Sequence, residues 1–354
     1  MSVESDGIFA KRLRNARIMM GYSMDDLVNA MGNSVSKMTI SKLEREKMGP
    51  SSSMVIALSS ALKVPVDYFF RPFTVEVDSL RFLSAKSRLS AKDENSLKEK
   101  ISDAAERYLS IEEICNASVS FASPVTYAIT NEEDVKKAAA VFRHSWNLGK
   151  NGIVSVTDLL EEHGIKVMET LLPSSFDGMS AVVNGTVPVV VLNSTYSPER
   201  KRFTLSHELG HLALSFDSTL SEKKEEKLCN IFASELLLPE DVFRTVIGYS
   251  RMSISYEEMK NLQIRYGISC DALMYKARVC GIITESKYRS FCSRRDSSPD
   301  FRAMTEKSYW PEEKSTRFQS LVFRALSDEL ITLSMASNLL GEDIESIREK
   351  HAVL

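Results

Sequence analysis

The segment RFTLSHELGHLALSF, residues 202–216, limits the fold of this chain more than any other stretch of its sequence. His207 and His211 stand four residues apart, so on a helix both imidazoles project from one face and can bind one Zn2+ ion. Glu208 lies next to that face, where this pattern places a general base that takes a proton from the attacking water. The alternative is a helix with two structural histidines, but two of only five histidines lie here, and Gly210 removes bulk beside the same face. The segment therefore predicts a zinc peptidase site with Glu208 as the catalytic base.

A predicted β-hairpin precedes this helix. Residues 179–183 and 187–192 are β-rich runs joined by Asn184-Gly185, which is a strong signal for a two-residue turn. Such a hairpin supplies an edge strand, on which zinc peptidases hold an extended substrate. Ser197 can then cap the histidine-bearing helix, because proline follows it in the first turn.

A catalytic zinc needs a third protein ligand and an open position. A second helix over residues 221–237 offers four acidic candidates, namely Glu222, Glu225, Glu226 and Glu235. Glu226 lies on the edge of that helix's apolar stripe and can reach the metal, so it is the preferred ligand. Glu235 could equally cap or pair structurally. Cys229 is a further alternative ligand, but it also reads as a small buried core residue.

The two motifs together resemble a known family. RFTLSHELGHLAL followed by EKLCNIFASELLLP is similar to the ImmA/IrrE zinc metallopeptidases over roughly residues 130–245. The resemblance implies zinc ligands at His207, His211 and Glu226 and a general base at Glu208. One departure is Leu228, where many members carry a second glutamate. The oxyanion-stabilising group is not identified; His163 and Tyr196 are candidates that also have structural explanations.

Residues 9–70 read as four or five short helices, with Ser23 and Ser36 as helix caps. This unit resembles the Xre/Cro-type helix-turn-helix. The resemblance implies a recognition helix in the DNA major groove, with five residues toward the DNA: Ser36, Lys37, Met38, Thr39 and Lys42. Four more basic residues could contact the phosphate backbone: Lys11, Arg12, Arg14 and Arg17. Met24 and the longer turn at Asn33-Ser34 depart from the family pattern, and a protein-docking or dimerisation module is the alternative.

The predicted fold class is α+β, with four parts along the chain. They are a helix-turn-helix domain (1–70), a connector and long helix (71–130), a metallopeptidase domain (131–285) and a helical C-terminal segment (286–354). The charged helix at 91–114 is expected to be a solvated spacer, and residues 293–300 a looser stretch. The C-terminal segment is expected to cap the core helically rather than to bind a regulatory partner.

Composition narrows the setting of the protein. A formal net charge of -3 gives no overall nucleic-acid signature, so DNA contact must come from a local surface. Five cysteines without a CxxC pair argue against both disulfides and a thiolate zinc site. No apolar run reaches the roughly 18 residues of a membrane span, and the N-terminus lacks a signal-peptide core. A cytoplasmic protein without membrane contact is expected.

Three functions follow as hypotheses. The first is a DNA-binding regulator that binds a double-stranded operator and cleaves a specific regulatory protein, such as a repressor, in a stress, phage or mobile-element response. The second is a transcriptional repressor or antitoxin-like protein with a structural or regulatory zinc. The third is self-cleavage in the connector near residues 71–90. A homodimer is a further expectation, because helix-turn-helix proteins commonly read paired half-sites.

Overall fold

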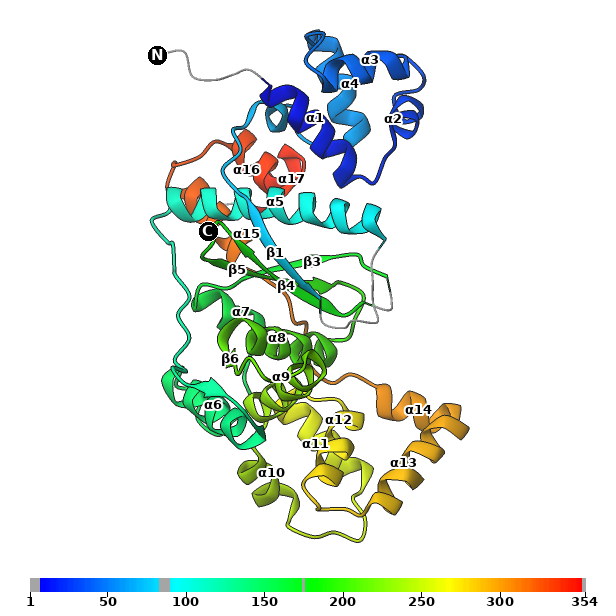
Figure 1. Cartoon of the computed structure of the whole chain (residues 1–354), viewed down its shortest axis with the longest axis vertical. Helices are drawn as coiled ribbons and strands as arrows, with labels where there is room; N and C mark the ends of the chain where they lie inside the picture. Colours follow the sequence, from blue (N-terminus) through cyan, green and yellow to red (C-terminus); the bar gives the residue numbers. More distant parts are fainter. Residues whose placement is uncertain (1–6, 83–89, 174–175, 352–354) are drawn as a thin grey trace.

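The computed structural model of the chain describes residues 7–82, 90–173 and 176–351. It contains a helical N-terminal unit, one mixed four-stranded sheet and helices on both sides of that sheet (Figure 1). The predicted α+β class is confirmed.

The N-terminal unit consists of five short helices. They are α1 (Ile8–Met19), α2 (Met24–Ala30), α3 (Lys37–Glu44), α4 (Ser52–Leu62) and the 3-10 helix η1 (Val66–Phe70). Ser23 and Ser36 cap α2 and α3 as predicted, because each side chain accepts a bond from a backbone N–H in the first turn. The unit closes its own apolar core, in which Leu13, Leu27 and Ile40 are fully buried.

The sheet combines strands that lie far apart in the chain. Its order is β1 (Val77–Phe82), β4 (Gly178–Val183), β5 (Val187–Asn193) and β3 (Lys166–Thr170). β4 pairs antiparallel with both β1 and β5, and β3 pairs parallel with β5. Asn184 and Gly185 form the predicted turn, and both have positive φ, at 50° and 69°. A short parallel pair joins β2 (Ala128–Ile129) to β6 (Ser215–Phe216).

The two faces of the sheet are covered by different helices (Figure 1). Alternate residues of β5 point to opposite faces: Val189 and Val191 pack toward α5 (Ala91–Ile114), whereas Val190 and Leu192 join the larger core on the other face. That larger core contains α8 (Pro198–Ala213), the helix that carries the histidine motif, and α9 (Glu222–Leu237). The site therefore lies on the face of the sheet opposite α5.

The long helix α5 is not the solvated spacer that its charge suggested. Leu97, Ile101 and Ala105 pack on the sheet, and Ser96 donates a hydrogen bond to the Met19 carbonyl of α1 at 2.7 Å. The connector contributes β1, which is hydrogen-bonded into the sheet. The division of the chain at residues 70, 130 and 285 stays a prediction.

The remaining helices lie around the larger core or pack on α5. They are α6 (Glu132–Ser145), α7 (Val156–Glu162), α10 (Glu240–Ile247), α11 (Tyr256–Tyr266), α12 (Cys270–Val279), α13 (Glu285–Ser297), α14 (Pro299–Glu306), α15 (Arg317–Ser327), α16 (Leu333–Leu340) and α17 (Ile344–Lys350). Residues 293–300, which were expected to be looser, are helical except at Ser298. Ser298 ends α13 and caps α14, whose first residue is Pro299.

The C-terminal helices form a cap, as expected, but they pack on α5. Leu321 and Val322 of α15 are buried in one cluster with Ile111 and Cys115 of α5. None of the five cysteines, all of which lie within the described ranges, forms a disulfide. Within the described ranges, no helix is both long enough and apolar enough to cross a membrane.

Candidate metal centre and DNA-facing helix

The helix α8 is anchored by a buried arginine before the histidine motif begins. Arg202 is fully buried and forms an ion pair of 2.7 Å with Glu313, which is equally buried. Its guanidinium also donates to the Gly267 carbonyl at 3.2 Å and lies 4.1 Å from the centre of the Trp310 ring. A buried ion pair holds its geometry when its remaining donors are satisfied, as they are here by backbone carbonyls. The histidine-bearing turn of α8 is therefore fixed in place.

A glycine allows α9 to approach α8 closely. A Cβ atom at Gly210 would lie 3.2 Å from Cys229 Sγ and 3.3 Å from a ring carbon of Phe232. A larger residue would therefore push the two helices apart. This close packing sets Glu226 of α9 opposite the histidines of α8.

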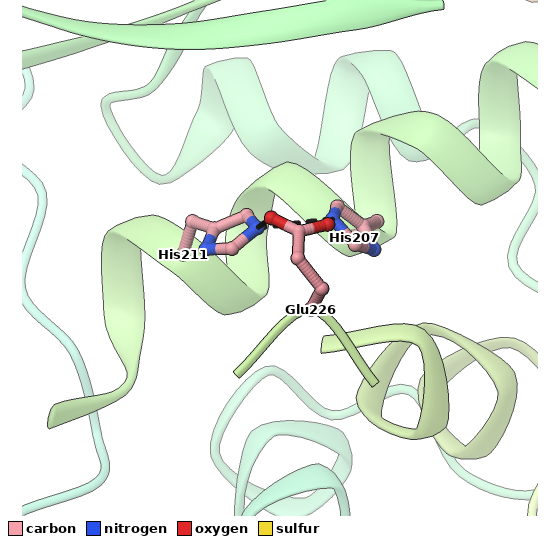
Figure 2. A group of neighbouring side chains, drawn as sticks. All are labelled: His207, His211 and Glu226. Atoms are coloured by element: carbon pink, nitrogen blue, oxygen red, sulfur yellow. Dashed lines mark hydrogen bonds and ion pairs between the residues drawn. The ribbon is translucent and has the colours of Figure 1, made fainter. Parts of the chain in front are cut away.

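The structure brings His207, His211 and Glu226 together (Figure 2). Their facing atoms are the two Nε2 nitrogens, 3.0 Å apart, and the carboxylate oxygens of Glu226, which lie 3.4 Å from His207 Nε2 and 3.1 Å from His211 Nε2. Burial raises the pKa of Glu226, but the hydrogen bonds and charges of the two histidines outweigh this effect and lower the pKa to about 2. The carboxylate is therefore ionised at neutral pH.

This donor set fits a zinc ion. Bonds of about 2.0–2.2 Å from zinc to imidazole nitrogen and carboxylate oxygen place tetrahedral donors roughly 3.3–3.6 Å apart. The separations between the three side chains are close to this spacing. Two imidazole nitrogens that face each other at 3.0 Å also repel unless a cation or a proton lies between them.

Two residues of α9 support the histidines from behind. Asn230 Oδ1 lies 3.1 Å from His207 Nδ1, so that nitrogen can donate to it while Nε2 stays free for a metal. Cys229 Sγ lies 3.5 Å from His211 Nδ1. Sequence reasoning did not single out Asn230, although its position four residues after Glu226 places both side chains on one helix face.

Glu208 is buried beside this cluster, on the side of the sheet. Its side chain is fully buried, and neither carboxylate oxygen makes a hydrogen bond of regular geometry within the described part of the chain. Burial raises the pKa of Glu208, while the nearby imidazoles and the Ser180 hydroxyl on β4 act in the opposite direction. A carboxylate with a raised pKa is a stronger base, which suits proton abstraction.

The other candidate residues lie elsewhere. Glu235 accepts the backbone N–H of Glu240 at 2.8 Å and pairs with Lys276 at 2.6 Å, so it is a structural residue. Glu222 and Glu225 lie toward the surface and are not part of the cluster.

The two oxyanion candidates have structural surroundings. His163 stacks on Trp146, with ring centres 4.0 Å apart. Tyr196 lies against the guanidinium of Arg200, 3.7 Å from the ring centre.

The helix α3 presents the residues expected to face DNA. Met38 is 67% exposed, and Lys42 is exposed as well. Ser36 accepts the backbone N–H of Thr39 at 3.1 Å and caps the helix. Lys37 pairs at 2.6 Å with Asp25, but both side chains are more than 60% exposed, so this ion pair is weak.

Two of the basic residues expected at the DNA backbone are engaged inside the protein. Arg12 is buried and pairs with Glu106 at 2.9 Å, and Arg17 pairs with Glu44 at 2.6 Å. Their guanidinium groups satisfy internal carboxylates and do not face solvent freely. Lys11 and Arg14 remain exposed on α1.

The fold and the donor cluster define a helix-turn-helix DNA-binding domain joined to a metallopeptidase-type domain. Residues 160–278 match the family model described as the IrrE N-terminal-like domain, which is a peptidase family, and residues 13–69 match the family model described as helix-turn-helix. Both resemblances that the sequence motifs predicted are thus confirmed, an IrrE-like one over residues 160–278 and a helix-turn-helix one over residues 13–69.

Two relatives carry the name radiation response metalloprotease IrrE. The protein of Deinococcus radiodurans is 33% identical over 99 residues, covering 25% of this chain and 30% of the relative. The protein of Deinococcus deserti is 31% identical over 99 residues, covering 25% of this chain and 34% of the relative. The chain thus spans about a third of the length of the curated relatives that it matches.

Proposed function

We propose that this protein is a DNA-binding regulator with zinc-dependent endopeptidase activity. The observation that carries the proposal is Glu208, a fully buried carboxylate without a regular hydrogen-bond partner among the described residues, beside two converging histidines and Glu226. Burying a carboxylate with so little hydrogen bonding costs free energy, and a purely structural metal does not require such a group. A general base that must receive a proton explains the arrangement.

Each residue of the site has a separate role in this proposal. His207, His211 and Glu226 hold the zinc ion, which when bound polarises the peptide carbonyl and lowers the pKa of water. Glu208 takes the proton from the attacking water and can later return it to the leaving amine. Asn230 fixes the orientation of the His207 ring.

The substrate and the biological setting are part of the proposal. A helix-turn-helix on the same chain favours cleavage of one regulatory protein, such as a repressor, near a double-stranded operator. The words "radiation response" in the names of both relatives favour a stress response. We further propose that the protein acts as a homodimer on paired half-sites.

The first test separates catalysis from metal binding. Glu208→Gln should retain bound zinc but stop the fragmentation of one target in a proteome comparison of cells that express either form. Glu226→Ala should lose zinc, measured by atomic absorption on purified protein, while the matched control Glu225→Ala keeps it.

Two outcomes would contradict the proposal. If the wild-type protein is purified without bound zinc, the proposed zinc centre is wrong. Target fragmentation that persists at the wild-type level with Glu208→Gln would leave the alternative, a repressor with a structural or regulatory zinc.

A further inference from the structure

The strand β1 covers the outer edge of β4. Its residues pair antiparallel with those of β4, from Val77 opposite Val183 to Phe82 opposite Met179. β4 and β5 form the hairpin that leads into α8, and without β1 the strand β4 would end the sheet on this side. Residues 77–82 therefore occupy an edge that would otherwise be open to another extended chain.

The covered strand is the one that packs on α8, the helix that carries the proposed catalytic base. β4 packs directly on α8, and Ser180 in the middle of the strand is fully buried. Two residues earlier, a Cβ atom at Gly178 would lie 2.7 Å from a methyl group of Thr204 on α8. Thr204 and Glu208 stand four residues apart on α8, so Glu208 lies on the helix face that meets β4. In β1, Arg81 is the residue whose backbone stands opposite Ser180.

Extended peptides commonly bind proteins by adding a strand to a sheet edge, with main-chain hydrogen bonds that any sequence can supply. We infer that β1 holds the place of the substrate's backbone, so that the enzyme is closed until this strand leaves β4. This inference rests on the proposed peptidase function. In this inference the edge of β4 binds an extended polypeptide segment. That segment can bind only after residues 77–82 have been displaced.

The pairing of β1 is suited to release. The register shifts between Val77 and Ser79, and such an irregularity interrupts the ladder. Asp78 instead accepts the Gly185 N–H at 2.6 Å, and Asn184 Oδ1 accepts the Glu76 N–H at 2.9 Å. Both bonds are exposed to solvent, where water can replace them at little cost.

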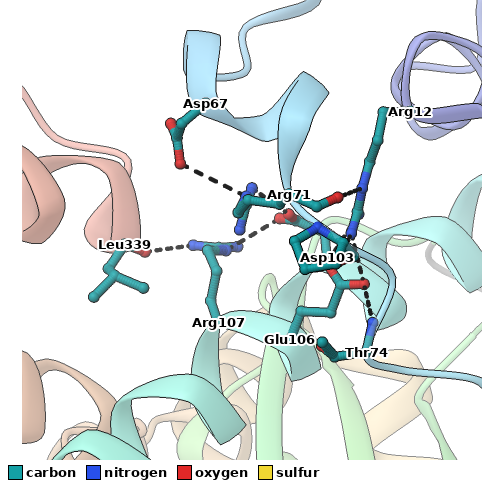
Figure 3. Close-up of polar contacts among 9 residues, drawn as sticks. Arg12, Asp67, Arg71, Thr74, Asp103, Glu106, Arg107 and Leu339 are labelled. Atoms are coloured by element: carbon teal, nitrogen blue, oxygen red, sulfur yellow. Dashed lines mark hydrogen bonds and ion pairs between the residues drawn. The ribbon is translucent and has the colours of Figure 1, made fainter. Parts of the chain in front are cut away.

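The DNA-binding domain holds the start of this strand (Figure 3). Arg12 of α1 donates to the carbonyls of Arg71 at 3.0 Å and Pro72 at 2.6 Å, and it pairs with Glu106 of α5. Glu106 in turn accepts the Thr74 N–H at 3.4 Å. Residues 71–74, which lead from η1 into β1, are thereby clamped between α1 and α5. A shift of the DNA-binding helices against α5 would pull on β1 directly.

The experiment compares a locked and a loosened strand in the full-length, zinc-loaded chain. Ser79→Cys with Val182→Cys joins two positions paired across β1 and β4. Asp78→Ala removes the bond between the chain's own strand and the Gly185 N–H, while the edge of β4 and the turn stay unchanged. The control is Asp328→Ala, which removes an exposed carboxylate at the end of α15, away from the sheet edge.

The probe is a fluorescein-labelled peptide of residues 74–82, TVEVDSLRF, which has the sequence that already fits this edge. Its binding is measured by fluorescence anisotropy in a Glu208→Gln background. We expect the loosened protein to bind roughly threefold more tightly than the parent, because the one lost exposed hydrogen bond favours strand release by about that factor, whereas the peptide keeps its own aspartate. The oxidised lock should not bind the peptide, and reduction should restore parent binding.

Binding that is equal in the oxidised lock, the parent and the loosened protein would overturn the inference. Cleavage of the same peptide, followed by mass spectrometry with Glu208 intact, separates this inference from the proposed function. Binding that follows strand release without cleavage of the peptide keeps the strand as the occupant of the edge, and the peptidase is then judged by the proteome comparison with Glu208→Gln alone. If the oxidised lock cleaves the peptide at an unchanged rate, the proposed peptidase function stands. The inference that β1 closes the enzyme is then wrong.

Discussion

The imidazole of His207 is held from two sides. Nε2 faces Glu226 and His211, and Nδ1 faces Asn230 Oδ1 at 3.1 Å. Of the two ring nitrogens, only Nε2 therefore points into the donor cluster. A ligand whose tautomer and orientation are fixed before the metal arrives binds it more tightly.

Removal of the Asn230 acceptor should weaken metal binding without removing a ligand. We expect Asn230→Ala to lower zinc affinity by roughly tenfold, the lower end of the effect known for such supporting residues. Competition with a chromophoric chelator measures this affinity. Asn230→Asp should retain most of it, and Lys227→Ala, an exposed change on the same helix, should have no effect. Equal affinities for Asn230→Ala and the wild type would mean that the contact does not orient His207.

The parts of the site that could be predicted are those that depend on spacing within one helix. His207 and His211 face the same side because four residues make about one helical turn. Glu226 required one more assumption, that the apolar stripe of α9 packs on α8, and Gly210 makes that packing close. The packing of β4 on the face of α8 that carries Glu208 could not be predicted, because it depends on how the helix lies against the sheet.

At the scale of the element, α3 is a helix with one buried and one open face. Ile40 and Leu43 are buried in the core of the N-terminal unit, while Met38 and Lys42 point outward. No salt bridge holds Lys42 among the described residues, whereas Lys37 is paired with Asp25. Lys42 is therefore the cation of α3 that is most available to a phosphate.

Lys42→Ala should weaken binding to duplex DNA and reduce its salt dependence. Each neutralised phosphate contributes about 0.9 to the slope of log affinity against log salt, so we expect a slope smaller by about that amount. Anisotropy titrations of a labelled mixed-sequence duplex at several salt concentrations measure it. Lys100→Ala on α5 is the matched control. If Lys42→Ala leaves the slope unchanged, the prediction that α3 contacts DNA is wrong.

Elements with strong local signals were predicted, and those fixed by distant partners were not. Capping serines and the Asn184-Gly185 turn act within a few residues, so the sequence around them is sufficient. The strand β1 pairs with β4, which lies far along the chain, and nothing near β1 marks that partner. In α5 the apolar face, formed by Leu97, Ile101 and Ala105, was obscured by the many charges on the other face.

At the scale of the whole molecule, Glu161 of α7 joins segments that are distant in the chain. Its Oε1 accepts hydrogen bonds from Tyr108 of α5 at 3.0 Å and from Ser315, just before α15, at 2.8 Å. Burial raises the pKa of Glu161 to about 7, although these two hydrogen bonds act in the opposite direction. The protonated carboxyl is therefore the form that the folded protein prefers.

This preference predicts a loss of stability as the pH rises. The pKa of Glu161 is about 7 in the folded chain, above its ordinary value of 4.5, so its contribution is complete below pH 4.5 and is lost as the pH rises through 7. The full loss is at most roughly 3 kcal/mol in the free energy of unfolding. Glu161→Gln cannot ionise, so it should be more stable than the wild type at pH 8 and similar to it at pH 5.

Urea unfolding at pH 5, 6, 7 and 8 measures the difference between the two proteins. Glu162→Gln, an exposed neighbour, is the control and should follow the wild-type curve. A constant difference between Glu161→Gln and the wild type across this range would show that Glu161 does not titrate there.

Arg202 and Glu313 are far apart in the sequence although they form an ion pair. This affects the order in which the parts of a nascent chain fold on the ribosome. The core of the helix-turn-helix domain is complete once Phe69 has emerged. The helix that carries the histidine motif receives its buried counter-ion 111 residues after Arg202. Because synthesis runs from the N-terminus and domains fold as units, the DNA-binding domain is finished while the metallopeptidase domain is still incomplete. An unfinished chain therefore completes the helix-turn-helix domain well before α8 gains the ion pair that anchors it.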